Sequence, residues 1–145
     1  MTIEKKVVKQ VKARKFRRLF FDIETSFNIV MSWNIGYNLN LEHDKILKER
    51  AIICVCWKCE GENKVHSLEW DKGCDKKLLQ QFMKVINTAD EIIGHNGDNF
   101  DIKWLRTRCL YHNIEAFPQY QTLDTYKLAK SGFRFNSNKL DYIGQ

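Results

Sequence analysis

The residues of this sequence best suited to chemistry are two acids, Asp22 and Glu24, within the otherwise apolar run at 19–25. A short apolar run bounded by charge is typical of a buried strand. Side chains alternate across a strand, so both carboxylates point to the same face. Two buried neighbouring carboxylates need a cation between them, and the hard cations Mg²⁺ and Mn²⁺ prefer oxygen ligands. The alternative is a strand end whose acids simply face water.

A third acid follows another short apolar run. Residues 91–94 read as a strand that ends at Gly94, a polar turn follows, and a helix is predicted to begin near Phe100. Asp101 then lies in the first helical turn, where the helix dipole favours an acid and from which it can reach the sheet. His95 and Asp98 are further candidates, although the turn can place both in solvent.

Taken together, these residues resemble the first two motifs of the DEDD 3′–5′ exonucleases. This superfamily has the ribonuclease H-like fold and includes the proofreading domains of DNA polymerases. The motifs are FDIET at 21–25 and N-x-x-x-F-D, formed by Asn96, Phe100 and Asp101. Two later stretches, 122–130 and 133–144, are similar to predicted exonuclease-like proteins of phages and bacteria that are related to family B polymerase proofreading domains.

The resemblance implies a metal-dependent 3′–5′ exonuclease that hydrolyses phosphodiester bonds in DNA, taken as a single strand or a 3′ end. A complete site of this kind holds two ions, here Mg²⁺ or Mn²⁺. Asp22 would contact both ions, Glu24 would hold one and orient the attacking water, and Asp101 would complete the shell of the other. Substrate would be held by the backbone at Ile23 and Thr25 and by the side chains of Asn96 and Phe100.

The superfamily also uses a fourth acid, preceded by a Tyr or His that acts as general base. No such pair lies between Asp101 and Gln145. Asp124 reads as a helix N-cap, and Asp141 is followed by Tyr142 in the wrong order. We therefore expect a domain without its C-terminal part, slow or inactive alone. The alternatives are a non-catalytic nucleic-acid-binding protein and half of a split nuclease completed by a second polypeptide.

The acids require a particular order of elements to position them. An antiparallel meander comes first and is followed by parallel strands, each preceded by a helix. Strands are predicted at 19–25, 50–57, 64–70, 89–94 and 121–124. Helices are predicted at 75–88 and 100–112, and two further helices are predicted to begin within 125–130 and 138–145. This order predicts an α/β, ribonuclease H-like mixed sheet flanked by helices and incomplete at its C-terminus.

The segment between the first two strands, residues 26–49, shows little periodicity. It is predicted to be a long loop with a short helical turn at 44–49. Long loops beside a catalytic strand often have a function. Trp33 and Tyr37 could stack on the bases of single-stranded nucleic acid. The interpretation that we favour is that they pack the loop onto the core.

Length and composition point to a single folded domain. The 145 residues are 43% apolar, with no run long enough to span a membrane. No signal-peptide core follows the basic start, so we expect a cytoplasmic protein of a bacterial host or a phage-infected cell. Five cysteines without an export signal predict free thiols, those at 54, 56 and 59 being buried in the core.

The positive charge is concentrated at the start of the chain. Residues 1–18 contain eight basic residues and one acid, whereas residues 19–145 contain 16 basic and 17 acidic residues. We therefore divide the chain into a basic N-terminal arm, 1–16, and a nuclease domain, 17–145. The arm is predicted to bind DNA phosphates, and the alternative is a solvated terminus. Its phosphate-binding residues would be Lys5, Lys6, Lys9, Lys12, Arg14 and Lys15.

Overall fold

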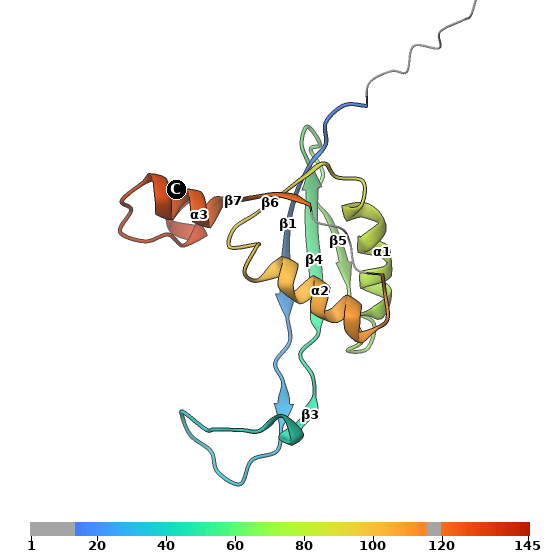
Figure 1. Ribbon diagram of the computed structural model, residues 1–145, viewed down its shortest axis with the longest axis vertical. Coiled ribbons are helices and arrows are strands. Elements are labelled where there is room, and N and C mark those ends of the chain that lie inside the picture. Colours follow the sequence, from blue (N-terminus) through green and yellow to red (C-terminus); the bar gives the residue numbers. More distant parts are fainter. Residues whose placement is uncertain (1–13, 116–119) are drawn as a thin grey trace, which may run out of the picture.

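The structure, a computed structural model, describes residues 14–115 and 120–145. Its centre is a five-stranded mixed sheet with the strand order β5-β4-β1-β6-β7 (Figure 1). The antiparallel part consists of β1 (Arg18–Thr25), β4 (Ile52–Cys59) and β5 (His66–Glu69). The strands β6 (Glu91–Gly94) and β7 (Gln121–Asp124) run parallel to β1. The predicted meander with parallel crossovers is therefore confirmed.

Two helices connect the parallel strands and cover one face of the sheet. They are α1 (Lys76–Ile86), between β5 and β6, and α2 (Asp101–Tyr111), between β6 and β7. The chain ends with α3 (Thr125–Gly132) and the short α4 (Leu140–Ile143). Figure 1 shows α3 well away from α1 and α2. The helices α1 and α2 begin and end within two residues of the predicted bounds, and α3 and α4 begin within two residues of the predicted starts.

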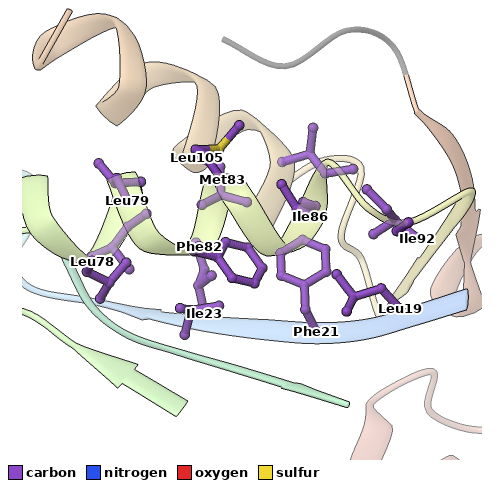
Figure 2. Close-up of a cluster of buried hydrophobic side chains, with 14 of the residues drawn as sticks. Leu19, Phe21, Ile23, Leu78, Leu79, Phe82, Met83, Ile86, Ile92 and Leu105 are labelled. Atoms are coloured by element: carbon purple, nitrogen blue, oxygen red, sulfur yellow. The ribbon is translucent and has the colours of Figure 1, made fainter. Parts of the chain in front are cut away.

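The core lies between β1 and the two covering helices. Leu19, Phe21 and Ile23 alternate along β1 and are buried against Phe82 and its neighbours on α1 (Figure 2). The ring centroids of Phe21 and Phe82 are 5.7 Å apart. Burial of one such side chain stabilises the fold by about 1.5–3 kcal/mol. A register slip of one residue would expose all three, so core packing determines which face of β1 presents the acids.

The acids of β1 occupy the opposite face of the sheet. Asp22 and Glu24 are both exposed, as is Phe20 between Leu19 and Phe21. The expectation that this pair of acids is buried is therefore wrong, because only the other face of β1 is covered by helices. Cys56, the partner of Asp22 in the register with β4, is exposed for the same reason, so the prediction of a buried thiol fails there. All five cysteines are free thiols, as expected.

The segment 26–49 is a projecting hairpin. β2 (Ile29–Val30) pairs with β3 (Ile46–Lys48) in a separate two-stranded sheet, and a 3-10 turn, His43–Lys45, precedes β3. Figure 1 shows this hairpin extending beyond the ends of β1 and β4. Trp33 and Tyr37 are fully exposed, at 100% and 101%. The packing that we favoured for them is wrong, because the hairpin lies beyond the sheet and out of reach of its core.

Only part of the basic arm falls within the described residues. Lys5, Lys6, Lys9 and Lys12 lie outside them. Arg14 forms an ion pair with Asp90, and Lys15 is exposed. DNA binding by this arm stays a prediction. Within the described ranges, no helix is long and apolar enough to cross a membrane.

Candidate active site

The first two acids of the site are placed by β1 and its pairing with β4. Asp22 lies opposite Cys56 and Glu24 opposite Cys54 in the antiparallel register. Asp22 is exposed but not fully solvated, so partial desolvation raises its pKa. The neighbouring Glu24 raises the pKa further, and His95 opposes the shift. Asp22 is therefore electrostatically coupled to both Glu24 and His95.

The third acid is brought to β1 by a tight turn between β6 and α2. Gly94 and Gly97 approach closely: a Cβ built on either residue would lie 3.3 Å from the Cα of the other. Such a distance is tighter than side chains normally tolerate, so glycine suits both positions. Asn96 between them has a positive φ of 61°, a conformation that asparagine adopts more readily than most residues. The turn delivers Asp101 as the first residue of α2.

The Asp101 carboxylate fills a gap in the hydrogen bonding of the sheet. Parallel pairing between β1 and β6 stops at Phe20 and Ile93. The N–H of Ile23, beyond that point, donates to Asp101 Oδ1 over 3.0 Å. This bond holds the acid against the middle of β1, one residue from both Asp22 and Glu24.

Asp101 is the most perturbed acid of the site. It is only 2% exposed, and no described lysine or arginine forms an ion pair with it. Burial, helped by the charges of Asp22 and Asp124 and opposed by the Ile23 hydrogen bond, raises the pKa of Asp101 to about 6. A buried carboxylate with acidic neighbours and no cation is a common feature of functional sites.

Two of the four predicted substrate-binding residues already have partners within the protein. The Ile23 N–H is already bonded to Asp101 and is not free for a nucleotide. Phe100 packs against the hydrophobic core. Asn96, in the turn after β6, and Thr25, at the end of β1, are half-buried.

Asp124 is buried and stabilises the turn between β6 and α2, whereas Asp22 and Glu24 are exposed. Its carboxylate accepts hydrogen bonds from the backbone N–H groups of Tyr126 and Lys127, which confirms the predicted N-cap of α3. It also accepts from the N–H groups of Asn96, at 2.9 Å, and Asp98, at 3.3 Å. Four donors therefore occupy this carboxylate.

His95 and Asp98 are both engaged, whereas the sequence left them open to solvent. The ring nitrogens of His95 contact Thr125 Oγ1 at 3.0 Å and the carbonyl oxygen of Asn138 at 2.8 Å. Asp98 forms a 2.6 Å ion pair with Lys127. His95 thus ties the segment after β7 to the edge of the site. No local pattern could reveal this, because its partners are 30 and 43 residues away.

The donor set is compatible with a divalent cation. Asp22, Glu24 and Asp101 offer only carboxylate oxygens, which hard divalent cations prefer. Asp101 in particular carries an uncompensated buried charge. In the part of the chain that the structure describes, no three His, Cys, Asp or Glu side chains converge closely enough to hold an ion. Ligation by all three acids therefore requires side-chain rotation, which the exposed Asp22 and Glu24 permit.

A comparison of folds gives a clear structural match. The structure of the family B DNA polymerase from the hyperthermophilic archaeon Pyrobaculum calidifontis matches 81% of this chain with a TM-score of 0.61, at 16% sequence identity. The match covers 16% of the polymerase chain. It confirms the predicted ribonuclease H-like fold.

Sequence comparison points in the same direction. A DNA polymerase of Thermococcus hydrothermalis is 25% identical over 118 residues, which cover 74% of this chain. A DNA polymerase of Desulfurococcus sp. (strain Tok) is 30% identical over 96 residues, or 65% of this chain. The chain spans 6% and 12%, respectively, of the length of these two relatives.

A protein-family model adds the assignment itself. Its description is a predicted 3′–5′ exonuclease related to the exonuclease domain of PolB, and it matches residues 41–143, well over half of the chain. The matched region includes Asp101 and begins after Asp22 and Glu24. The chain belongs to this family of predicted 3′–5′ exonucleases related to the exonuclease domain of PolB.

Proposed function

We propose that this chain is a divalent-metal-dependent 3′–5′ exonuclease that hydrolyses phosphodiester bonds of DNA. Asp22, Glu24 and Asp101 would hold Mg²⁺ or Mn²⁺. The observation that carries the proposal is the Asp101 carboxylate, which is buried beside Asp22 without a described cationic partner. Family membership supports the exonuclease class, and the metal and the activity are our inference.

The three acids would have different tasks. Asp101 is fixed by the Ile23 N–H and provides a rigid anchor. Asp22 and Glu24 lie on the uncovered face, where a DNA end can approach them from solvent. A bound divalent cation would supply charge stabilisation for the phosphoryl group and a more acidic water. Above pH 6 Asp101 is mainly ionised, so the site is most negative, and most in need of a cation, at neutral pH.

A second candidate, DNA binding without efficient turnover, is favoured by the state of Asp124. This acid is occupied by four backbone donors and Asp141 is exposed on α4, so neither replaces the expected fourth acid. Loss of general acid–base help typically costs about 10²–10⁴-fold in rate. Slow turnover by this chain alone, and restoration by a helix from a second polypeptide, stay predictions.

Digestion of single-stranded DNA labelled at its 5′ end tests the proposal. With Mn²⁺ the wild type should give a ladder that shortens from the 3′ end, and EDTA should stop it. Asp22→Ala and Asp101→Asn should abolish the ladder. Asp141→Asn is the matched control, because it removes an exposed acid outside the site and should leave the rate unchanged.

Digestion that persists in Asp22→Ala would contradict the proposed site. Binding of DNA by the wild type with no digestion, even at high enzyme concentration and long incubation, would identify the second candidate as correct.

A further inference from the structure

The segment that follows β7 differs in charge from the rest of the nuclease body. Residues 125–145 contain four basic residues and one acid, whereas residues 19–124 contain 12 basic and 16 acidic residues. Lys127 is paired with Asp98. Lys130, Arg134 and Lys139 are exposed, and none of them forms an ion pair within the described ranges. Their charge is therefore available to an anionic ligand.

The same segment exposes a pair of aromatic rings. Phe133 and Phe135 stack on each other with centroids 5.1 Å apart and an interplanar angle of 23°. They are 63% and 41% exposed, and Arg134 lies between them in the chain. Aromatic faces beside unpaired cations are the combination with which proteins bind single-stranded nucleic acid without reading its sequence.

Contacts of His95 place this segment at the edge of the candidate active site. The two nitrogens of its ring contact Thr125 and Asn138, at the start of α3 and after the aromatic pair. Its ring also meets the Tyr126 ring edge-on at 5.6 Å. The same histidine is electrostatically coupled to Asp22. His95 therefore connects the segment that follows β7 to Asp22 of the candidate active site.

We propose that residues 130–139, with the stacked rings of Phe133 and Phe135 and the cations Lys130, Arg134 and Lys139, bind single-stranded DNA beside the site. The rings stack on bases and the cations contact phosphates. This inference rests on the proposed function for its ligand, since a DNA exonuclease must hold the strand whose end it attacks. It is independent of metal binding and turnover.

The projecting hairpin also exposes aromatic residues, and the part of it that carries them lacks the charge that this ligand requires. Residues 26–41 include the fully exposed Trp33 and Tyr37 but contain no charged residue. Its apolar tip therefore offers stacking without phosphate contacts. This difference makes the hairpin a matched control for the segment after β7.

Fluorescence anisotropy with a labelled 12-nucleotide oligothymidylate tests the inference. The measurements are made in EDTA, so that hydrolysis does not contribute. Stacking of one base contributes enough that its removal should weaken binding about fivefold or more. We therefore expect the double variant Phe133→Ala/Phe135→Ala to bind at least about fivefold more weakly than the wild type. The control variant Trp33→Ala/Tyr37→Ala should bind as the wild type does.

An abasic oligonucleotide of the same length separates stacking from charge. With it, the wild type and the Phe133→Ala/Phe135→Ala variant should bind equally, because the phosphates remain and the bases are gone. Arg134→Ala/Lys139→Ala should weaken binding to both oligonucleotides and flatten the dependence on salt.

The inference would be overturned by unchanged oligothymidylate affinity in the phenylalanine variant, or by an equal loss in the hairpin control. Failure of DNA digestion would leave these binding results intact, so failure of the proposed function can be told apart. Circular dichroism of each variant shows whether the fold is retained, and single Phe133→Leu and Phe135→Leu variants, which keep apolar volume without an aromatic face, replace any variant that unfolds.

Discussion

Two buried aspartates, Asp75 and Asp101, have opposite surroundings. Asp75 is fully buried between the helices and β4, where its oxygens accept hydrogen bonds from the Ile52 N–H and from Arg108 and His112. Asp101 is 2% exposed and accepts from the Ile23 N–H, but its charged neighbours are the acids Asp22 and Asp124.

The pKa values reflect this difference. Burial alone would raise the pKa of Asp75, but hydrogen bonds from Arg108, Ile52 and His112 outweigh burial and lower it. Burial also acts on Asp101, and there the acidic neighbours add to it, so its pKa rises to about 6. Asp75 therefore supports the fold, while Asp101 destabilises the metal-free protein at neutral pH. A cation bound at Asp101 would remove that cost. The buried acid that has cationic partners within the protein therefore serves the fold, and the buried acid without one is the candidate for function.

The largest effect is expected when Asp75 loses its charge. Asp75→Asn leaves the buried guanidinium of Arg108 without a counter-ion and places an amide N–H₂ among donors. Breaking a buried ion pair in this way typically costs about 3–5 kcal/mol of unfolding free energy. Urea denaturation at pH 7.5 measures it, and a loss below about 1 kcal/mol would show that Arg108 does not depend on this carboxylate.

The same substitution at Asp101 should raise the free energy of unfolding instead of lowering it. Asp101→Asn keeps an acceptor for Ile23 and removes an unfavourable charge. A rise in pKa from 3.8 to about 6 corresponds to about 3 kcal/mol of folded-state destabilisation at neutral pH. In EDTA at pH 7.5 the variant should therefore unfold at higher urea concentration than the wild type. Lower stability of the variant would contradict the account of this carboxylate.

The pH dependence of the difference in unfolding free energy between the wild type and Asp101→Asn is an independent test of this explanation. Because the folded-state pKa of Asp101 is raised, its contribution to stability is complete below pH 4 and is lost as the pH rises to about 6. The wild type and Asp101→Asn should therefore have similar unfolding free energies at pH 3.5 and diverge between pH 4 and 6.5. A constant difference across this range would exclude titration of Asp101 as the cause.

A smaller effect is expected at His112, which donates a hydrogen bond to the same aspartate as Arg108. His112 Nε2 lies 2.6 Å from Asp75 Oδ1, and its side chain is 10% exposed. His112→Gln should cost about 0.5–1.5 kcal/mol, the usual net value of one hydrogen bond, because Arg108 still neutralises Asp75. Thermal unfolding can resolve this shift. A loss of unfolding free energy as large as that of Asp75→Asn would show that His112, and not Arg108, is the residue that mainly neutralises Asp75.

The site region was more predictable from sequence than the structural ion pair. Alternation along residues 19–25 placed Asp22 and Glu24 on one face, and the turn before Phe100 placed Asp101 at the start of a helix. These are local patterns. The pairing of Asp75 with Arg108 joins residues 33 apart, and sequence analysis treated Asp75 only as the start of a helix.

Non-local geometry also explains the other features of the structure that the sequence did not predict. The hairpin at 26–49 has too few alternating residues to reveal its two short strands, and its aromatic residues gave no indication that they lie beyond the reach of the core. Exposure of Asp22 and Glu24 depends on which face the helices cover, which the composition of β1 alone does not determine. The contacts of His95 require knowledge of where the chain after β7 returns.

Calorimetric titration with Mn²⁺ at pH 7.5 tests the central claim most directly, namely that Asp22, Glu24 and Asp101 form a cation site. The wild type should show saturable binding, and Asp22→Ala and Asp101→Asn should remove it. Loss of binding in Asp101→Asn cannot come from unfolding, because this variant is expected to be more stable than the wild type. Asp141→Asn should bind as the wild type does. Mn²⁺ binding of unchanged affinity in both Asp22→Ala and Asp101→Asn would contradict the account.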